Sequence, residues 1–167
     1  EIDIPFTDID LANVTGGAHQ LGWSVDQPTV APDGTAYLAY TKITSHDFER
    51  SEGWLLRSKN VMRERDASKV VWEVLPDPAL PIYSPDFGPV QEEHVLTTLS
   101  DGSLYIVFRT ADGVIGHTRS RDAGATWSQP EQLHYGPGGR IMRHSRANAA
   151  LFKTRDGRFL LWFNNYT

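Results

Sequence analysis

Three segments of this 167-residue chain repeat one pattern, in which an apolar run is followed by an Asp-Gly pair and a second apolar run. The pairs begin at Asp33, Asp101 and Asp156. Asp-Gly between apolar runs is a strong short-range signal for a β-hairpin, because glycine readily adopts the positive φ that a tight turn requires. We therefore expect an all-β chain. The helical signal is poor, and only residues 64–69 are expected to make a helical turn.

Each of the first two hairpins is followed by two further short apolar strands. These strands are residues 53–58 and 70–75 after the first hairpin, and residues 113–120 and 126–128 after the second. Four-stranded sheets repeated in series are typical of the blades of a β-propeller. Because the third unit stops after its hairpin, we predict about two and a half four-stranded blades in a single propeller domain. The blade-like units are residues 24–76, 90–133 and 147–167, within a domain that takes in residues 1–167.

An unclosed propeller leaves a sheet face and a strand edge uncovered, and propellers close with about four to eight blades. We therefore expect the chain to be part of a longer protein, in which the remainder of the propeller is its partner. A small stand-alone β-sandwich is the alternative, because the hairpins alone would permit it.

The octet Ser-Arg-Asp-Ala-Gly-Ala-Thr-Trp begins at Ser120. Ser120 and Asp122 can bond nearby backbone N–H groups and hold a tight turn, and Gly124 suits a position with positive φ. Thr126 and Trp127 are expected to begin a strand. The octet matches Ser-x-Asp-x-Gly-x-Thr-Trp, the Asp-box of sialidase-like β-propellers, and so resembles that family. Residues 58–72 occupy the equivalent place in the first unit, as a longer and degenerate version.

Residues 93–109 carry a second resemblance, which bears on function. They read Glu-His-Val-Leu-Thr-Thr-Leu-Ser-Asp-Gly-Ser-Leu-Tyr-Ile-Val-Phe-Arg and are similar to the sialidase segment Glu-x-x-Val-Val-x-Leu-x-Asp-Gly-x-Leu-x-x-x-x-Arg. That family is a six-bladed propeller that removes terminal sialic acid. The resemblance implies that Glu93 polarises a tyrosine nucleophile and that Arg109 is one of three arginines that clamp the substrate carboxylate. The alternative is a salt bridge between an exposed Glu93 and an exposed Arg109 at the rim.

The chain departs from the family pattern at the first hairpin. Sialidases have Arg-Ile-Pro there, with the first clamp arginine, whereas this chain has Asp26-Gln27-Pro28. An aspartate at the substrate-binding position would repel a carboxylate. The resemblance leaves Asp47, in the loop after the first hairpin, as the candidate acid/base residue. The third arginine and the tyrosine would lie beyond Thr167.

His94 directly follows Glu93, and on a regular strand the two side chains point to opposite faces. If His94 lines the channel, a different chemistry is open, because similar propellers include polysaccharide lyases that use histidine as a base on uronate-containing glycans. A histidine near its reference pKa is a suitable general base. The alternative is a capped or half-buried histidine.

Residues 138–146 form the most basic part of an acidic chain. Arg143 and Arg146 are candidates for binding an anionic sugar, and the alternative is that they pair with acids of a neighbouring blade. The tryptophans in strands, Trp72, Trp127 and Trp162, are expected in the core.

Composition excludes several classes of function. The net charge is −5 with no block of Lys or Arg, so we expect no nucleic-acid partner. No apolar run is long enough to span a membrane. With no cysteine, scattered histidines and no calcium or phosphate loop, we expect neither a metal nor a cofactor.

We expect a secreted or periplasmic protein that hydrolyses a terminal acidic sugar of a glycan. A non-catalytic glycan-binding propeller stays open beside the lyase.

Overall fold

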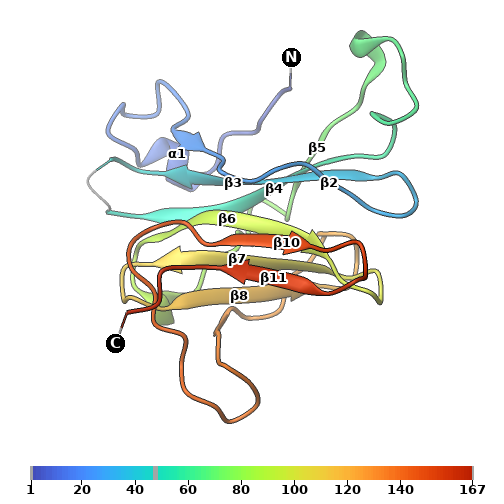
Figure 1. Ribbon diagram of the computed structural model, residues 1–167. Helices are drawn as coiled ribbons and strands as arrows, with labels where there is room; N and C mark the ends of the chain where they lie inside the picture. Colours follow the sequence, from blue (N-terminus) through green and yellow to red (C-terminus); the bar gives the residue numbers. More distant parts are fainter. Residues whose placement is uncertain (1, 47–48, 167) are drawn as a thin grey trace.

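The computed structural model describes residues 2–46 and 49–166, and they form antiparallel sheets that do not close on one another (Figure 1). Strands make up 36% of the structure and helices 6%, which confirms the all-β prediction. The first two sheets have at least four strands each, and the third sheet is a hairpin of two strands.

The first sheet has the strand order β1-β3-β4-β5, with β2 pairing to the other end of β3. Its strands are β1 (Gly22–Trp23), β2 (Thr29–Val30), β3 (Ala36–Ile43), β4 (Ser51–Ser58) and β5 (Glu73–Leu75). Gly22 lies opposite Lys42 and Val30 lies opposite Ala36, so β1 and β2 run along β3 as one interrupted strand. The first unit therefore has the four strand positions that its sequence predicts.

The second sheet has the order β6-β7-β8-β9, and the third is the β10-β11 hairpin. Their strands are β6 (Gln91–Thr98), β7 (Leu104–Thr110), β8 (Ile115–Ser120), β9 (Glu131–Gln132), β10 (Ala150–Lys153) and β11 (Phe159–Trp162). All three Asp-Gly hairpins are confirmed, and Gly34, Gly102 and Gly157 have φ values of 85°, 82° and 83°. The same local chemistry thus builds the same turn three times.

The hydrophobic core lies between successive sheets. Leu55 of the first sheet packs with Leu96, Ile106 and Phe108 of the second in one buried cluster. A second cluster joins the second and third sheets, and the third sheet lies across the face of β6 and β7 (Figure 1). Both β2 and β10 contact β6, so the first strands of the three units lie side by side.

The third sheet corrects one expectation about the tryptophans. Trp72 and Trp127 pack against buried clusters, but the Trp162 residue is 70% exposed. Leu161 packs toward the second sheet. Because side chains alternate along a strand, Trp162 points to the opposite, uncovered face.

The helical elements are short. A 3₁₀ helix at Ala67–Lys69 lies within the segment expected to be helical, and a second one lies at Pro85–Phe87. The α-helix α1 (Asp8–Leu11) was not predicted from the sequence. The Thr7 backbone N–H donates to Asp10 Oδ2 at 2.8 Å, which completes a capping box at its start. Thr-x-x-Asp was the signal that could have indicated it.

The Asp-box forms the expected turn. Ser120 Oγ accepts the N–H of Gly124 at 2.9 Å, and Asp122 Oδ1 accepts the N–H of Thr126 at 2.9 Å. The Trp127 indole N–H donates back to the Gly124 carbonyl at 3.2 Å. The prediction that Thr126 and Trp127 begin a strand was wrong, because their polar groups close the turn and the next strand is β9.

The first unit contains a related turn. Ser58 Oγ accepts the N–H of Val61 at 3.1 Å, and Asn60 Oδ1 accepts the N–H of Val71 at 3.0 Å. Asn60 therefore does what Asp122 does in the octet, across a longer loop. The spacing between serine and acceptor is the same in both turns, which explains why the degenerate version still forms.

We expect Gly124→Ala to lower the free energy of unfolding by about 2–3 kcal/mol. Gly124 has a φ of 90°, and a Cβ there would lie 2.5 Å from Leu55 Cδ2 of the neighbouring sheet. Gly157→Ala is the matched control, because Gly157 has a φ of 83° and open space around it, so only the backbone strain of about 1 kcal/mol applies. Urea unfolding measures both, and equal losses would contradict the role of the contact with Leu55.

Candidate functional site

The start of β6 is distorted by a β-bulge. Glu92 lies opposite Arg109, and regular pairing resumes with Val95 opposite Val107. Two residues of β6, Glu93 and His94, thus lie opposite a single residue of β7. Glu93 has a φ of 57°, which is rare for a residue with a side chain. The regular alternation expected at Glu93 and His94 is therefore interrupted, and both Glu92 and Glu93 can turn toward β7.

Arg109 forms ion pairs with both glutamates. Its Nη2 pairs with Glu92 Oε2, and its Nε lies 2.8 Å from Glu93 Oε2. The side chains of Arg109, Glu92 and Glu93 are 5%, 1% and 17% exposed. The structure therefore brings Glu93 and Arg109 together, in a buried cluster rather than on an exposed rim. Glu93 is its most accessible member.

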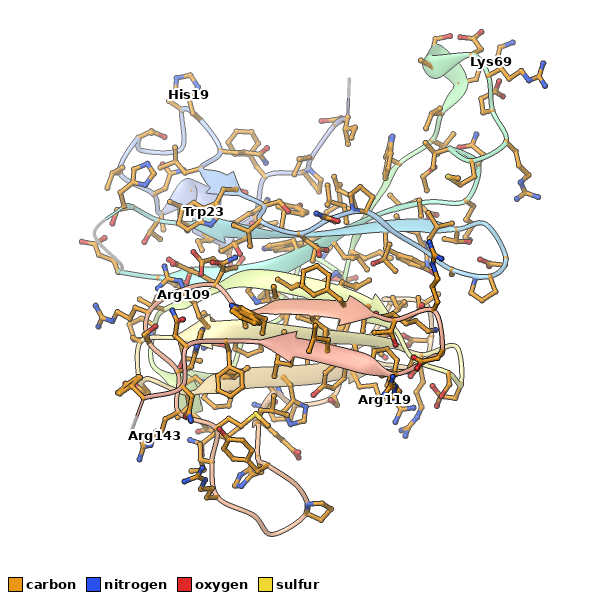
Figure 2. All side chains as sticks on the ribbon, viewed as in Figure 1. His19, Trp23, Lys69, Arg109, Arg119 and Arg143 are labelled. Carbon is orange, nitrogen blue, oxygen red and sulfur yellow. The ribbon has the colours of Figure 1, made fainter. Side chains whose placement is uncertain are left out.

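This cluster lies at the end of the sheets opposite the hairpin turns. Figure 2 shows Arg109 and Arg143 at one end of the molecule and Arg119, which lies in β8 next to its last residue, at the other. The Asp-box and the three Asp-Gly turns lie at the Arg119 end. Each Asp-Gly turn joins two antiparallel strands there. The structural motif and the candidate site thus occupy opposite ends.

Burial controls the charge of the two glutamates. It raises the pKa of Glu93, while the Arg109 guanidinium and, more weakly, the His144 imidazole act in the opposite direction. Burial also raises the pKa of Glu92, with Arg109 again opposing. Two carboxyl groups therefore compete for one guanidinium, and either can hold a proton more easily than an exposed glutamate.

The structure places His94 in the interior, between the first and second sheets. Its Nδ1 lies 3.0 Å from Thr41 Oγ1, and its ring stacks on Phe108 with 5.0 Å between centroids. Burial lowers the pKa of His94 to about 3, so the ring is neutral. A Cβ on Gly53 would lie 2.3 Å from the ring, which shows how closely the core surrounds it. His94 is therefore positioned for packing and has no open route to a glycan.

Asp26 connects the first two sheets. Its carboxylate accepts the N–H of Ala39 in β3 at 3.0 Å and the N–H of Leu96 in β6 at 3.2 Å. Burial raises the pKa of Asp26 to about 6, although these hydrogen bonds oppose the change. Leu96 lies four residues along β6 from Glu92, a separation of about 13 Å on a strand. The structure therefore does not bring Asp26 to the Glu93–Arg109 pair.

The groove beside Asp26 is about 450 Å³ and is lined by the first strands of all three sheets. Its walls are residues 25–30, 95–98 and 148–153. Asp26 and Lys153 are the acidic and the basic residue that line this groove.

The other predicted residues have separate positions. Arg143 and Arg146 are exposed, and Arg143 forms an isolated β-bridge with Val114 at the end where Arg109 lies (Figure 2). Asp47 lies outside the described residues. One member of the cluster, Glu92, was not predicted from the sequence. The Glu-Glu doublet at the start of β6 was the available signal for Glu92.

The described part of the chain has neither a cluster of metal ligands nor a membrane-spanning helix. Within residues 2–46 and 49–166, no three His, Asp or Glu side chains gather as a metal site would need. Over the same residues, no helix has the length and apolar character needed to cross a membrane.

No protein-family model and no curated protein sequence matches this chain. Solved structures do resemble it. A protein of unknown function from Dyadobacter fermentans DSM 18053 superimposes with a TM-score of 0.61 at 16% identity, over 85% of this chain. The Hadza microbial sialidase Hz136 superimposes with a TM-score of 0.52 at 20% identity, over 81% of this chain. The chain spans 34% and 23% of the lengths of these proteins, and at such identities the likeness shows a common fold.

Proposed function

We propose that this chain is part of a sialidase-like six-bladed β-propeller that hydrolyses a terminal acidic sugar from a glycan. Its first two sheets have the strand order of propeller blades, and the octet at Ser120 forms an Asp-box turn. The fold likeness to a sialidase supports the proposal. Further blades of the same propeller would cover the open face of β10 and β11 and complete the site.

The observation that carries the proposal is the Glu92–Glu93–Arg109 cluster at one end of β6 and β7. An arginine fork suits a planar carboxylate, and a glutamate beside a phenol can act as its base in a covalent mechanism. Because burial raises the pKa of both glutamates, one can take up a proton when a substrate carboxylate approaches Arg109. The guanidinium can then exchange one carboxylate for another without leaving an unpaired buried charge.

Three further residues belong to the proposal through their positions or through the family resemblance. Arg143 and Arg146 would contact the acidic sugar from the exposed loop at the Arg109 end. Asp47 would supply the acid/base carboxyl group. We also propose that the protein acts in the periplasm or after secretion, where glycan substrates of this kind are found.

We expect Glu93→Gln to lower kcat/KM for a fluorogenic sialoside about a hundredfold or more, because the amide cannot accept a proton. Glutamine has the size and shape of glutamate, so the variant should keep the bulge and the position of the side chain beside Arg109. Glu131→Gln is the matched control, since Glu131 is exposed in β9 and lies outside the cluster. The control variant should keep the activity of the unaltered protein.

The same assay separates the other glycan-acting functions. A lyase would release unsaturated products that absorb in the ultraviolet and would tolerate Glu93→Gln. A non-catalytic binding propeller would bind to acidic glycans on an array and would hydrolyse none of them. Either result would overturn the hydrolase. The burial of His94 supports the hydrolase over a lyase that would use this histidine as its base.

A further inference from the structure

The β-bulge at the start of β6 is held from the neighbouring sheet by Thr41, a fully buried residue of β3. Thr41 Oγ1 accepts the backbone N–H of Glu93 at 3.1 Å and lies 3.0 Å from His94 Nδ1. Glu93 and His94 are the two residues of the bulge that lie opposite a single residue of β7. One hydroxyl group of the first sheet therefore contacts both residues of the bulge.

The two contacts of the Thr41 hydroxyl group give this network a direction. A hydroxyl group has one hydrogen to donate and two lone pairs, one of which accepts the N–H of Glu93. If His94 Nδ1 carried a hydrogen, the buried hydroxyl hydrogen would have no acceptor among the described residues. We infer that the Thr41 hydroxyl donates to His94 Nδ1, and that Nε2 carries the hydrogen of the ring. Burial lowers the pKa of His94 to about 3, so Nδ1 stays an acceptor at neutral pH.

The packing of the core fixes the position of the His94 ring. Gly53 lies opposite Thr41 in β4, and a Cβ on Gly53 would lie 2.3 Å from His94 Nε2. The ring also stacks on Phe108 of β7, with 5.0 Å between centroids. The imidazole is thus confined between the first two sheets, and Nδ1 stays directed at the Thr41 hydroxyl group.

Glu93 needs such a restraint, because its backbone conformation is unfavourable. Its φ of 57° lies in the left-handed region, which residues with a Cβ rarely adopt. A conformation of this kind persists only where the surrounding structure imposes it, and β-bulges redirect a side chain in this way. The Glu93 side chain is directed to β7, where its Oε2 lies 2.8 Å from Arg109 Nε. The contact of Thr41 with the Glu93 backbone therefore bears on the position of the carboxylate.

We propose that Thr41 and His94 are positioning residues, which hold the β-bulge at Glu93 from the first sheet and the core and so keep the Glu93 carboxylate beside Arg109. The inference rests on the proposed function for the reaction that this carboxylate serves. Both residues are buried and act through the backbone of Glu93. His94 thus contributes to the site through the Thr41 hydroxyl group and not as a base.

Amide hydrogen exchange followed by NMR tests the restraint without any need for activity. Thr41→Val keeps the shape of the side chain but loses the hydroxyl group, so the Glu93 N–H should exchange about tenfold faster or more. The Leu96 N–H of the same strand is the internal reference, because Asp26 accepts it at 3.2 Å. Thr41→Ser keeps a hydroxyl group and should retain the ratio of the Glu93 and Leu96 exchange rates.

Hydrolysis of a fluorogenic sialoside tests the consequence for the site. Thr41→Val should lower kcat about tenfold and leave KM within about twofold, because a displaced carboxylate slows the reaction while Glu92 still holds Arg109 for binding. Thr41→Ser should restore kcat. Thr118→Val is the matched control, since Thr118 is a fully buried threonine that donates to a backbone carbonyl at 2.7 Å toward the Asp-box end. It should change neither kcat nor the exchange ratio.

Long-range ¹H–¹⁵N NMR correlation of the unaltered chain covers the case in which Thr41→Val does not fold. It should show His94 with its hydrogen on Nε2, and a hydrogen on Nδ1 would overturn the inference. An unchanged exchange ratio in folded Thr41→Val would also overturn it. If the ratio rises but Glu93→Gln keeps sialoside hydrolysis, the proposed function fails while the restraint stands. If Glu93→Gln abolishes hydrolysis but Thr41→Val keeps kcat, only the positioning role fails.

Discussion

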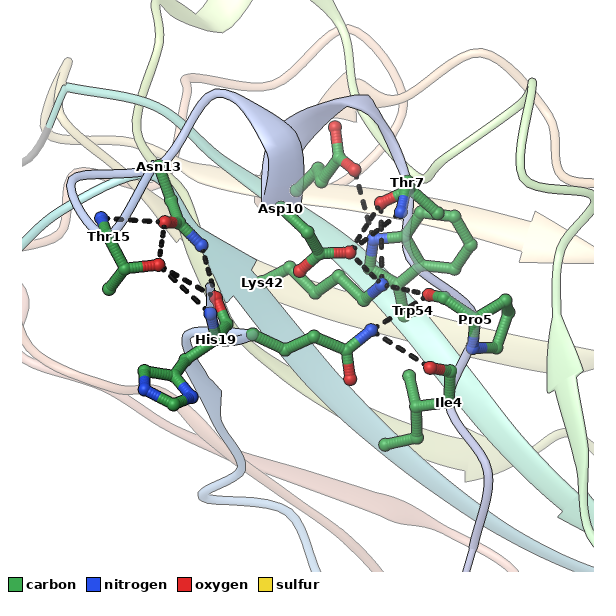
Figure 3. Close-up of polar contacts among 11 residues, drawn as sticks. Ile4, Pro5, Thr7, Asp10, Asn13, Thr15, His19, Lys42 and Trp54 are labelled. Carbon is green, nitrogen blue, oxygen red and sulfur yellow. Dashed lines mark hydrogen bonds and ion pairs between the residues drawn. The ribbon is translucent and has the colours of Figure 1, made fainter. Parts of the chain in front are cut away.

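Lys42→Met is expected to lower the free energy of unfolding by about 3–5 kcal/mol, because it leaves a buried carboxylate without its cation. Lys42 Nζ lies 2.6 Å from Asp10 Oδ2, and the two side chains are 2% and 0% exposed (Figure 3). Nζ also donates to the Pro5 carbonyl at 2.8 Å and lies 4.8 Å from the centre of the Trp54 ring. The substitution removes all of these contacts but keeps the aliphatic volume.

Urea unfolding of Lys42→Met measures the loss. Lys69→Met is the control, because Lys69 is exposed and its pair with Asp66 at 3.5 Å is worth about 1 kcal/mol at most. The double variant Lys42→Met with Asp10→Asn should cost less than the sum of the single variants, since no charge then stays buried alone. Additive losses would show that the pair is not coupled.

The second large effect concerns acid stability. His94 is neutral in the folded chain, because burial lowers its pKa from 6.5 to about 3. Below pH 6.5 the unfolded chain gains a proton that the folded chain does not take up until about pH 3. The free energy of unfolding should therefore fall as the pH falls from 6.5 toward 3, by at most about 5 kcal/mol. Above pH 6.5 this contribution is fully present.

The buried carboxyl groups act with the opposite sign. Burial raises the pKa of Asp26 to about 6 and raises those of Glu92 and Glu93, so their contribution is present at low pH and lost as the pH rises. The effect of His94 is therefore measured by comparing the free energy of unfolding against pH for the unaltered chain and for His94→Gln. The variant should be less stable at pH 7 and should have a flatter acid limb.

His19→Gln provides the control for this experiment, because His19 is exposed at the tip of the N-terminal loop (Figure 2). It should reproduce the pH profile of the unaltered chain. If His94→Gln keeps the full slope between pH 6.5 and 3, other groups determine the acid stability and the burial of His94 does not.

The fold was largely predictable because its signals are local. Each Asp-Gly turn depends on one aspartate and one glycine, such as Asp101 and Gly102, and these bond their own backbone neighbours. The Asp-box likewise closes within eight residues. The failures at Thr126 and Trp127 have the same origin, since the indole and the threonine hydroxyl serve the turn instead of a strand.

The candidate site was predictable only in part. The motif indicated Glu93 and Arg109, and the hairpin brings them to one end of the second sheet. The bulge that gives Glu93 its positive φ has no clear local signal, so the burial of His94 and the part taken by Glu92 did not follow from alternation. The contact of Thr41 with Glu93 depends on how the first sheet packs against the second, which is a contact between distant parts of the chain.

The sequence by itself determined the strands, the hairpins and the Asp-box, because each needs only neighbouring residues and their φ preferences. The tertiary structure alone decided which charges are buried together. Asp10 meets Lys42 only when separate segments pack, and that packing excludes the water that would otherwise screen each charge. The φ preference of a residue depends on its neighbours in the sequence, whereas its desolvation depends on which other segments pack against it.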